Sequence, residues 1–168
     1  TVQIPLIIMG YFNPMMQFGM EKFCQKCAEV GIDGLIIPDL PLFVYETEYK
    51  AIFEKYNLKN IFLITPQTSS ERILQIDTIS DSFIYMVSSA AVTGSQSGFG
   101  SEQMDYFKRI SDLKLKNPQI VGFGIKDNQT FLEATKYQNG AIIGSAFINF
   151  LKENSIAKIG DFVKKILN

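Results

Sequence analysis

The sequence predicts an α/β fold organised around a parallel sheet. Six short, almost unbroken apolar runs alternate with longer segments in which apolar residues recur at helical spacing. Unbroken apolar strands are typical of sheets that are covered on both faces, and regular alternation with helices indicates parallel pairing. No shift in composition divides the chain, so we expect residues 1–168 to form a single domain.

This periodicity fits two architectures. The six strands could form an open doubly wound sheet, or they could supply about six βα units of a TIM (β/α)8 barrel. A complete barrel typically needs about 250 residues, so a chain of 168 residues would hold only part of one. The spacing of the strands does not distinguish the two architectures.

Each predicted strand is rich in Ile, Leu, Val, Phe or Met. The six runs are Leu6–Met9, Leu35–Ile37, Ile61–Ile64, Phe83–Val87, Val121–Ile125 and Ala141–Ala146. The second run ends where Pro38 and Pro41 remove the amide protons that a sheet ladder needs. The first run is followed by Gly10–Pro14, whose glycine, asparagine and proline predict a turn-forming loop.

Helical spacing fills the segments between these runs. The predicted helical segments are one ending near Val30, then Val44–Tyr56, one ending at Ile79, Met104–Leu115, Asp127–Gln138, one opened by Ser145, and Ile156–Leu167. Thr68 and Glu71 have the spacing of a capping box, which predicts Thr68 as an N-cap. The long polar segment Ser88–Gly100 has the composition of a lid over a site.

The composition excludes several classes of protein. A net charge of −1 provides no basic surface for nucleic acid or for an anionic membrane. No apolar run approaches the roughly 18 residues of a spanning helix, and the N-terminus does not resemble a signal peptide. We therefore expect a cytoplasmic protein. The chain has no His and begins with Thr1 rather than Met, which suggests an excerpt or a processed product of a longer protein.

Cys24 and Cys27 form a C-x-x-C pair, a spacing that is found in redox and zinc motifs. Here both lie in a segment whose apolar residues recur at helical spacing. Without His or a second Cys pair, a zinc site of four ligands cannot be completed within one chain. We expect two buried structural cysteines and no metal site.

The stretch Val121–Ala146 contains two apolar runs that end abruptly in glycine. Gly124 and Gly144 would let the backbone approach a ligand closely, and Ser145 would open a helix whose free N–H groups favour an anion. The last two βα units of phosphate-binding barrels have this pattern. The same glycines also suit ordinary tight packing, so both interpretations remain open at this point.

Several blocks together resemble one known family. They are Leu6–Pro14, Gly31–Pro41, Ala91–Gly94, Gly122–Ile125 and Gly140–Ala146. In this order and spacing the chain resembles the α subunit of tryptophan synthase, from about Pro5 to Ile148. The resemblance implies a TIM barrel, of which this chain would be the C-terminal two-thirds from the third strand onward.

The resemblance also implies an activity and a partner. The family cleaves indole-3-glycerol phosphate by a retro-aldol reaction to indole and glyceraldehyde 3-phosphate, a lyase step of tryptophan biosynthesis. The indole passes to a β subunit within an αββα tetramer, and the pyridoxal phosphate of that β subunit joins it to serine. No cofactor is expected in the α subunit itself.

Site residues follow from the same resemblance. The phosphate would be bound at Gly94, Phe123, Gly124, Gly144 and Ser145. The substrate pocket would comprise Met9, Tyr11, Ile36, Leu63, Tyr85, Thr93 and Ile142, of which the aliphatic members would equally be barrel core. Thr93 resembles the family's lid threonine, and Asn13 lies in a block resembling the surface that faces the β subunit. Asp39 is expected to cap a helix or anchor a loop, and Lys126 to be solvated.

The departures from the family pattern concern catalysis. The family uses a Glu to protonate the indole ring and an Asp to stabilise charge at the indole nitrogen, and both would lie upstream of Thr1. No catalytic residue is therefore assigned in this chain. Ser89–Ala91 stands where the family has an arginine and then a glycine. Two alternatives stay open: a catalytically silent partner that binds and activates the β subunit, and another phosphate-binding TIM-barrel enzyme.

Overall fold

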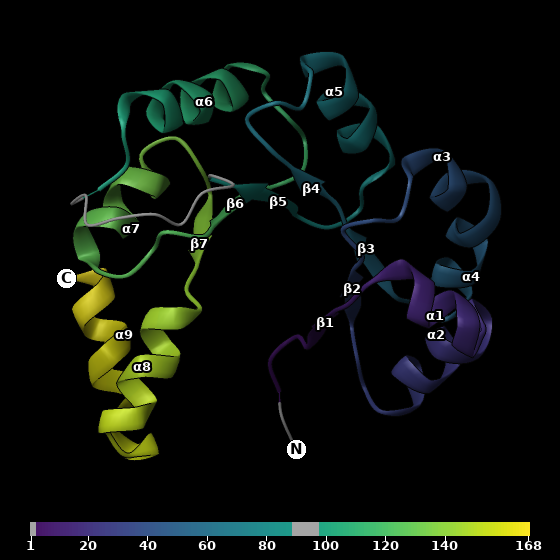
Figure 1. Ribbon diagram of the computed structural model, residues 1–168, viewed down its shortest axis with the longest axis horizontal. Helices are drawn as coiled ribbons and strands as arrows, with labels where there is room; N and C mark the ends of the chain where they lie inside the picture. Colours follow the sequence, from purple (N-terminus) through teal and green to yellow (C-terminus); the bar gives the residue numbers. More distant parts are fainter. Residues whose placement is uncertain (1–2, 89–97) are drawn as a thin grey trace.

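The computed structural model describes residues 3–88 and 98–168. In these ranges parallel strands form a curved wall, and helices cover its outer side (Figure 1). The strands are β1 Ile7–Met9, β2 Gly34–Ile36, β3 Lys59–Ile61, β4 Leu63–Ile64, β5 Ile84–Val87, β6 Gln119–Gly122 and β7 Gly140–Ile142. The α-helices are α1 Phe12–Phe18, α2 Met20–Glu29, α3 Leu42–Val44, α4 Lys50–Lys55, α5 Ser70–Ile79, α6 Ser101–Asp112, α7 Asn128–Thr135, α8 Ser145–Glu153 and α9 Ile159–Leu167.

The strands pair in the order β1-β2-β3 and β4-β5-β6-β7, and every pair is parallel. β3 and β4 are two halves of one chain segment, separated by Phe62, whose carbonyl accepts a hydrogen bond from the Tyr85 amide at 2.9 Å. The predicted strand Ile61–Ile64 is therefore split, because its first part pairs with β2 and its second part with β5. A staggered register of this kind is what bends a parallel sheet into a barrel.

Side chains of β2 and β5 alternate between two apolar layers. Leu35, Ile84 and Met86 point outward into the core shared with the helices. Ile36 and Tyr85 instead belong to a second cluster on the inner side of the wall. Successive residues of a strand face opposite sides, so the inner cluster holds the side chains that a barrel directs toward its axis.

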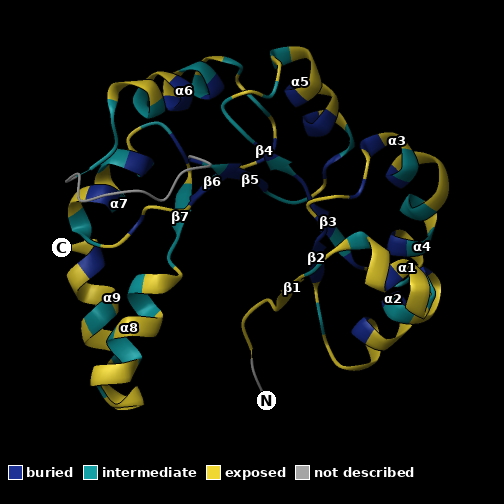
Figure 2. Cartoon of the chain, in the orientation of Figure 1, coloured by how far each residue is buried: buried dark blue, intermediate teal, exposed yellow. Residues whose placement is uncertain are grey.

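The two ends of the wall are open in the described part of the chain. Neither the outer edge of β1 nor that of β7 has a strand partner among residues 3–88 and 98–168. Met9 of β1 is 52% exposed, and α8 contains no buried residue. Figure 2 shows this exposure in yellow along β1 and over much of α8 and α9. The described residues thus form a partial barrel.

The loop prediction for Gly10–Pro14 is wrong, because helix α1 begins at Phe12 and contains Pro14. Proline is tolerated in a first helical turn, where its missing N–H would have no partner within the helix. The start of α1 is stabilised by Asp39, whose Oδ1 accepts the Phe12 amide at 2.8 Å. The expected anchoring role of Asp39 is confirmed.

The N-cap of α5 is Ser69 rather than the predicted Thr68. The Ser69 hydroxyl accepts the Arg72 amide at 3.2 Å. The Thr68 hydroxyl instead accepts the Thr65 amide at 2.9 Å, so it closes the preceding turn. The sequence pattern located the start of α5 but placed its N-cap one residue too early.

Other boundaries differ by a few residues. The predicted helix Met104–Leu115 runs from Ser101 to Asp112, and Lys114 beyond it has a φ of +53°, which is incompatible with further helix. The segment predicted as Val44–Tyr56 is helical from Leu42 and contains a π-helical turn at Tyr45–Tyr49. A 3-10 turn at Ile156–Lys158 precedes α9.

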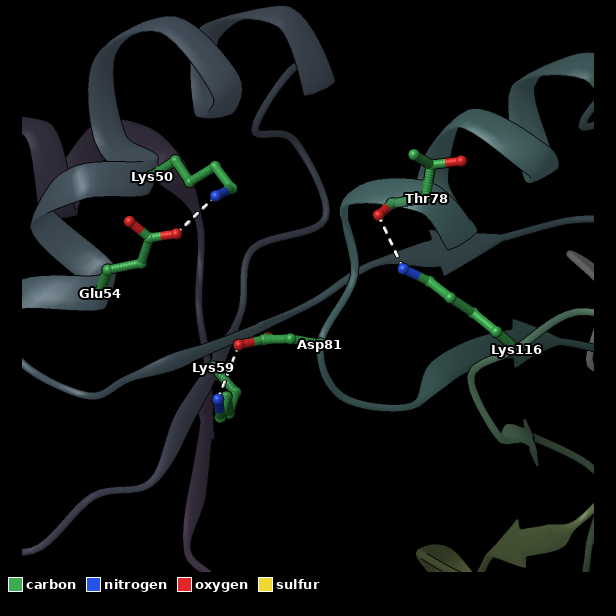
Figure 3. A network of polar contacts seen from close by, with 6 residues as sticks. All are labelled: Lys50, Glu54, Lys59, Thr78, Asp81 and Lys116. Atoms are coloured by element: carbon green, nitrogen blue, oxygen red, sulfur yellow. Dashed lines mark hydrogen bonds and ion pairs between the residues drawn. The ribbon is translucent and has the colours of Figure 1, made fainter.

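Polar contacts join neighbouring units at the amino-terminal ends of the strands, away from the loops that follow them. Lys59 donates to Asp81 at 2.6 Å, and the Lys116 ammonium donates to the Thr78 carbonyl at 2.8 Å (Figure 3). In TIM barrels this end of the strands serves stability. A functional site is therefore expected at the opposite end of the strands.

The two cysteines are buried and free, as expected. They lie on α2 with exposed fractions of 0% and 3%. Burial raises the pKa of Cys24 to about 12, and the neighbouring Cys27 and Glu21 add to this shift. Within the described ranges, no group of three or more His, Cys, Asp or Glu side chains is arranged to hold a metal ion.

Candidate functional site

A cavity of about 290 Å³ lies at the carboxyl-terminal ends of β5, β6 and β7. Its lining consists of Tyr85, Phe123, Gly124, Ile125, Lys126, Ile142, Gly144, Ser145 and Ala146. Six of these were predicted from sequence as phosphate-binding or pocket residues. In parallel α/β folds ligands bind at this end of the strands, where the loops that follow them meet.

The turn after β6 has an unusual backbone. Phe123 has a φ of +69° and Gly124 a φ of +80°, so two consecutive residues adopt left-handed conformations. Glycine adopts this conformation at little cost, whereas for phenylalanine it is unfavourable. Strain of this kind persists where surrounding contacts stabilise it, and it clusters at ligand sites.

Tyr85 and Phe123 form an aromatic side of the cavity. Their rings meet edge to face, with centroids 6.1 Å apart. Tyr85 lies directly over Gly122, where an added Cβ would come within 2.0 Å of the tyrosine oxygen. Burial raises the pKa of Tyr85 above its usual range, so its hydroxyl remains protonated at neutral pH. Gly122 is required here because the Tyr85 ring occupies the space of a side chain.

Helix α8 begins at the edge of the same cavity. Gly144 precedes its first residue, and an added Cβ at Gly144 would meet no atom within 4 Å. The first N–H groups of a helix lack partners within the helix, and the helix dipole makes this end favourable for an anion. Ser145 and Gly144 are both exposed, so this helix start is accessible from solvent.

Four predicted pocket residues, Met9, Tyr11, Ile36 and Leu63, lie outside the lining of this cavity. Ile36, Leu63, Tyr85 and Ile142 belong to one cluster on the inner side of the wall. Met9 is paired with Ile36 in the β1–β2 register, which places both side chains on the same face of the sheet. Tyr11 follows β1 and is 69% exposed.

Not every predicted residue is at the cavity. Thr93 and Gly94 lie outside the described residues. Asn13 is exposed on α1, on the loop side of β1 and β2. Lys126 is exposed as expected but also lines the cavity, and its position two residues after Gly124 was the available signal for that placement.

The described lining of the cavity contains no carboxylate. Its polar groups are backbone amides, the Ser145 hydroxyl, the Tyr85 phenol and Lys126. Such a set can bind and orient an anion, and its apolar side can hold a ring, but it supplies no carboxylic acid for proton transfer. None of the described helices is long and apolar enough to cross a membrane.

Comparisons with known proteins agree on one family. A family model described as tryptophan synthase alpha chain matches residues 1–167. A tryptophan synthase alpha chain of Flavobacterium johnsoniae is 70% identical over 166 residues, which cover 99% of this chain and 66% of that protein. The alpha chain of Bacteroides thetaiotaomicron is 53% identical over an alignment that covers 97% of this chain and 66% of that protein. The chain thus spans slightly less than two thirds of the length of these relatives.

Solved structures agree with the fold. The tryptophan synthase subunit alpha of Campylobacter jejuni superposes with a TM-score of 0.80 at 27% identity, over 99% of this chain and 66% of that one. The A-subunit from the hyperthermophile Pyrococcus furiosus gives a TM-score of 0.80 at 26% identity, over 98% of this chain and 66% of that one. The curved wall of parallel strands is therefore part of a TIM barrel, and the open doubly wound sheet is excluded.

Proposed function

Since this chain belongs to the tryptophan synthase alpha chain family, we propose that it forms the phosphate end and the apolar wall of a lyase site. The substrate is indole-3-glycerol phosphate, which is cleaved to indole and glyceraldehyde 3-phosphate. Residues 1–168 act as one partial-barrel domain of a cytoplasmic enzyme of tryptophan biosynthesis. This domain uses no cofactor of its own.

One observation carries this proposal: two anion-binding backbone features share a cavity with an apolar wall. Gly124 and the start of α8 at Ser145 line this cavity together with Tyr85 and Ile142. A substrate that carries both a phosphate and an indole ring matches this combination of backbone amides and apolar surface. Neutral amides hold the phosphate of substrate and product alike, so their role is to orient the substrate for cleavage.

The cleavage itself needs an acid that protonates the indole ring and a carboxylate that stabilises charge at its nitrogen. The described lining contains neither. We therefore assign both groups to the part of the family's length that this chain does not span. In this arrangement the described residues bind and orient the substrate, and the remaining part of the site supplies proton transfer.

A partner surface is part of the same proposal. Asn13 is exposed on α1, and two large aromatic side chains are also exposed, Tyr11 just before α1 at 69% and Phe43 in α3 at 72%. Exposed aromatic side chains beside polar groups are typical of protein interfaces. A tryptophan synthase β subunit in an αββα tetramer is the partner that we assign to this surface.

The test measures the release of indole from indole-3-glycerol phosphate by the protein expressed from its complete gene. Gly144→Asp places a carboxylate at the start of α8, where space is open and φ is not positive. We expect the KM for substrate to rise at least about tenfold, since a like charge opposes phosphate binding at close range. The matched control is Gly160→Asp in α9, which also meets no atom within 4 Å.

The alternative is a silent partner that activates the β subunit without cleaving substrate, and the family match does not favour it. The two functions separate in one experiment. The lyase releases indole in the absence of a β subunit, whereas the silent partner only raises the rate at which the β subunit consumes added indole. Indole release unchanged by Gly144→Asp would contradict the proposed phosphate site.

A further inference from the structure

Ser88 is a buried polar residue at the start of the segment that was predicted as a lid, and it does not line the cavity. It follows β5 directly and is 2% exposed. Its amide donates to the Gly122 carbonyl at 3.2 Å, and its hydroxyl donates to the Phe123 carbonyl at 2.8 Å. The hydroxyl therefore reaches 35 residues along the chain to the left-handed turn at the edge of the cavity.

The bond to Phe123 determines the direction of the next amide. The peptide group is planar and trans, so the Phe123 carbonyl and the Gly124 N–H point in opposite directions. Ser88 holds the carbonyl on its own side, and Ser88 does not line the cavity, whereas Phe123 and Gly124 do. The Gly124 N–H therefore points away from Ser88, and Gly124 itself lines the cavity.

A second observation places protein on the Ser88 side of the turn. A Cβ added at Gly124 would lie 3.2 Å from Cε1 of Phe99 and 3.8 Å from the Ser88 hydroxyl. The Phe99 ring packs edge to face on the buried Phe107, with centroids 5.1 Å apart. One side of Gly124 is thus filled by packed side chains, and its other side faces the cavity.

Because residue 124 is a glycine, the Phe123–Gly124 peptide needs an outside contact to fix its orientation. Rotation of the peptide between Phe123 and Gly124 changes only ψ of the first residue and φ of the second. Glycine accepts positive and negative φ about equally, so Gly124 by itself does not prevent the N–H from turning away. The hydrogen bond from the Ser88 hydroxyl to the Phe123 carbonyl favours one orientation of this peptide over the other.

We propose that Ser88 is a positioning residue for anion binding: its hydroxyl orients the Phe123–Gly124 peptide so that the Gly124 N–H donates to a phosphate. This inference rests on the proposed phosphate site and deepens it. Ser88 itself does not touch the ligand. It acts through the carbonyl of Phe123.

The test uses the protein as its own gene encodes it, with inorganic phosphate as the probe. Phosphate affinity is measured by calorimetry, and the amide signals of Gly124 and Ser145 are followed by NMR during the titration. Ser88→Ala removes the hydroxyl alone, and we expect phosphate affinity to fall about tenfold, which corresponds to about 1.4 kcal/mol. Ser88→Thr keeps the hydroxyl and is expected to retain most of the affinity.

The matched control is Ser80→Ala. Ser80 is 4% exposed, and its hydroxyl has no hydrogen-bond partner in the described part of the chain. It precedes β5 at the other end of the strand, so its removal is expected to leave phosphate affinity unchanged. A loss of affinity in Ser88→Ala and not in Ser80→Ala supports positioning over a general loss of packing.

The outcomes separate this inference from the proposed function. If the wild-type protein binds no phosphate, both are overturned. If it binds phosphate with a shift at Ser145 but none at Gly124, the phosphate site stands and the role of Ser88 is overturned. Equal affinity of Ser88→Ala and wild type, with the same Gly124 shift, also overturns it. The wild-type titration gives a result even if Ser88→Ala does not fold.

Discussion

Replacing Gly122 with alanine is the sharpest test of the packing behind the candidate site. The new Cβ would lie 2.0 Å from the Tyr85 oxygen, 2.2 Å from Cζ and 2.4 Å from Cε1. Ordinary contacts between carbon atoms are about 3.5–4 Å, so the tyrosine ring must move by more than an ångström. The ring is 7% exposed and is packed in the inner cluster, so no small adjustment accommodates it.

Overpacking of this kind typically costs about 1–3 kcal/mol, and we expect Gly122→Ala to lower the free energy of unfolding by this amount. Urea denaturation measures it as a shift in midpoint at constant slope. Gly140→Ala is the control, because its nearest atom would be 3.9 Å away. Tyr85 lines the cavity, so we expect the displaced ring to enter it and to weaken phosphate binding as well.

A double substitution tests the cause. Tyr85→Leu removes the ring, so adding Gly122→Ala to it should cost much less than Gly122→Ala alone, a coupling of about 1–3 kcal/mol. Additive effects, or a Gly122→Ala variant within about 0.5 kcal/mol of wild type, would refute the reasoning. Either result would mean that the tyrosine does not occupy the space above Gly122.

Three further predictions concern the framework. Asp77 is 8% exposed and accepts the Asn117 amide at 3.0 Å and its side-chain amide at 2.8 Å, so Asp77→Ala should lower the free energy of unfolding by about 2–3 kcal/mol; a loss below about 0.5 kcal/mol in urea denaturation would contradict this. Hydrogen bonds from Thr130, first its hydroxyl and then its amide, lower the pKa of Asp127, so the N-cap contributes stability above the unfolded pKa, about 3.9, and loses it as pH falls through the lower folded value. Asp127→Ala should therefore lower the free energy of unfolding by about 1 kcal/mol at pH 7 and make that free energy fall less steeply as the pH is lowered. An unchanged pH dependence on the acid side would show that Asp127 does not cause this loss of stability. Burial raises the pKa of Cys24 to about 12, so its thiol should not react with a disulfide reagent at pH 8 until the protein is unfolded. Rapid labelling of the native protein would show that the Cys24 thiol is accessible to solvent.

The strands and most helices were predictable because their signals are local. A continuous apolar run such as Leu35–Ile37 is typical of a strand that is buried on both faces. Alternation of such runs with helical segments indicates a parallel sheet. Gly124, Gly144 and Ser145 were likewise visible as a pattern, since glycine after a buried strand marks a close approach of the backbone. The structure brings all three to one cavity.

Local signals failed at the starts of two helices. Gly10–Pro14 has the composition of a loop, yet Phe12 begins a helix because Asp39, 27 residues away, accepts its amide. Thr68 has the spacing of a cap, yet its hydroxyl accepts the Thr65 amide, and Ser69 caps the helix instead. In both cases a single hydrogen bond outside the pattern reverses the local preference.

The sequence by itself determined the class of fold and the order of its strands and helices, and it predicted the glycines around which a phosphate would bind. These depend on apolar spacing and on backbone freedom, which each short segment carries within itself. Only the tertiary structure decided that Phe123 adopts a left-handed conformation, that Tyr85 fills the space above Gly122, and that Ser88 holds the Phe123 carbonyl. The physical reason is that these features arise from contacts between residues about 35 positions apart, which exist only once the sheet has brought β5 and β6 side by side.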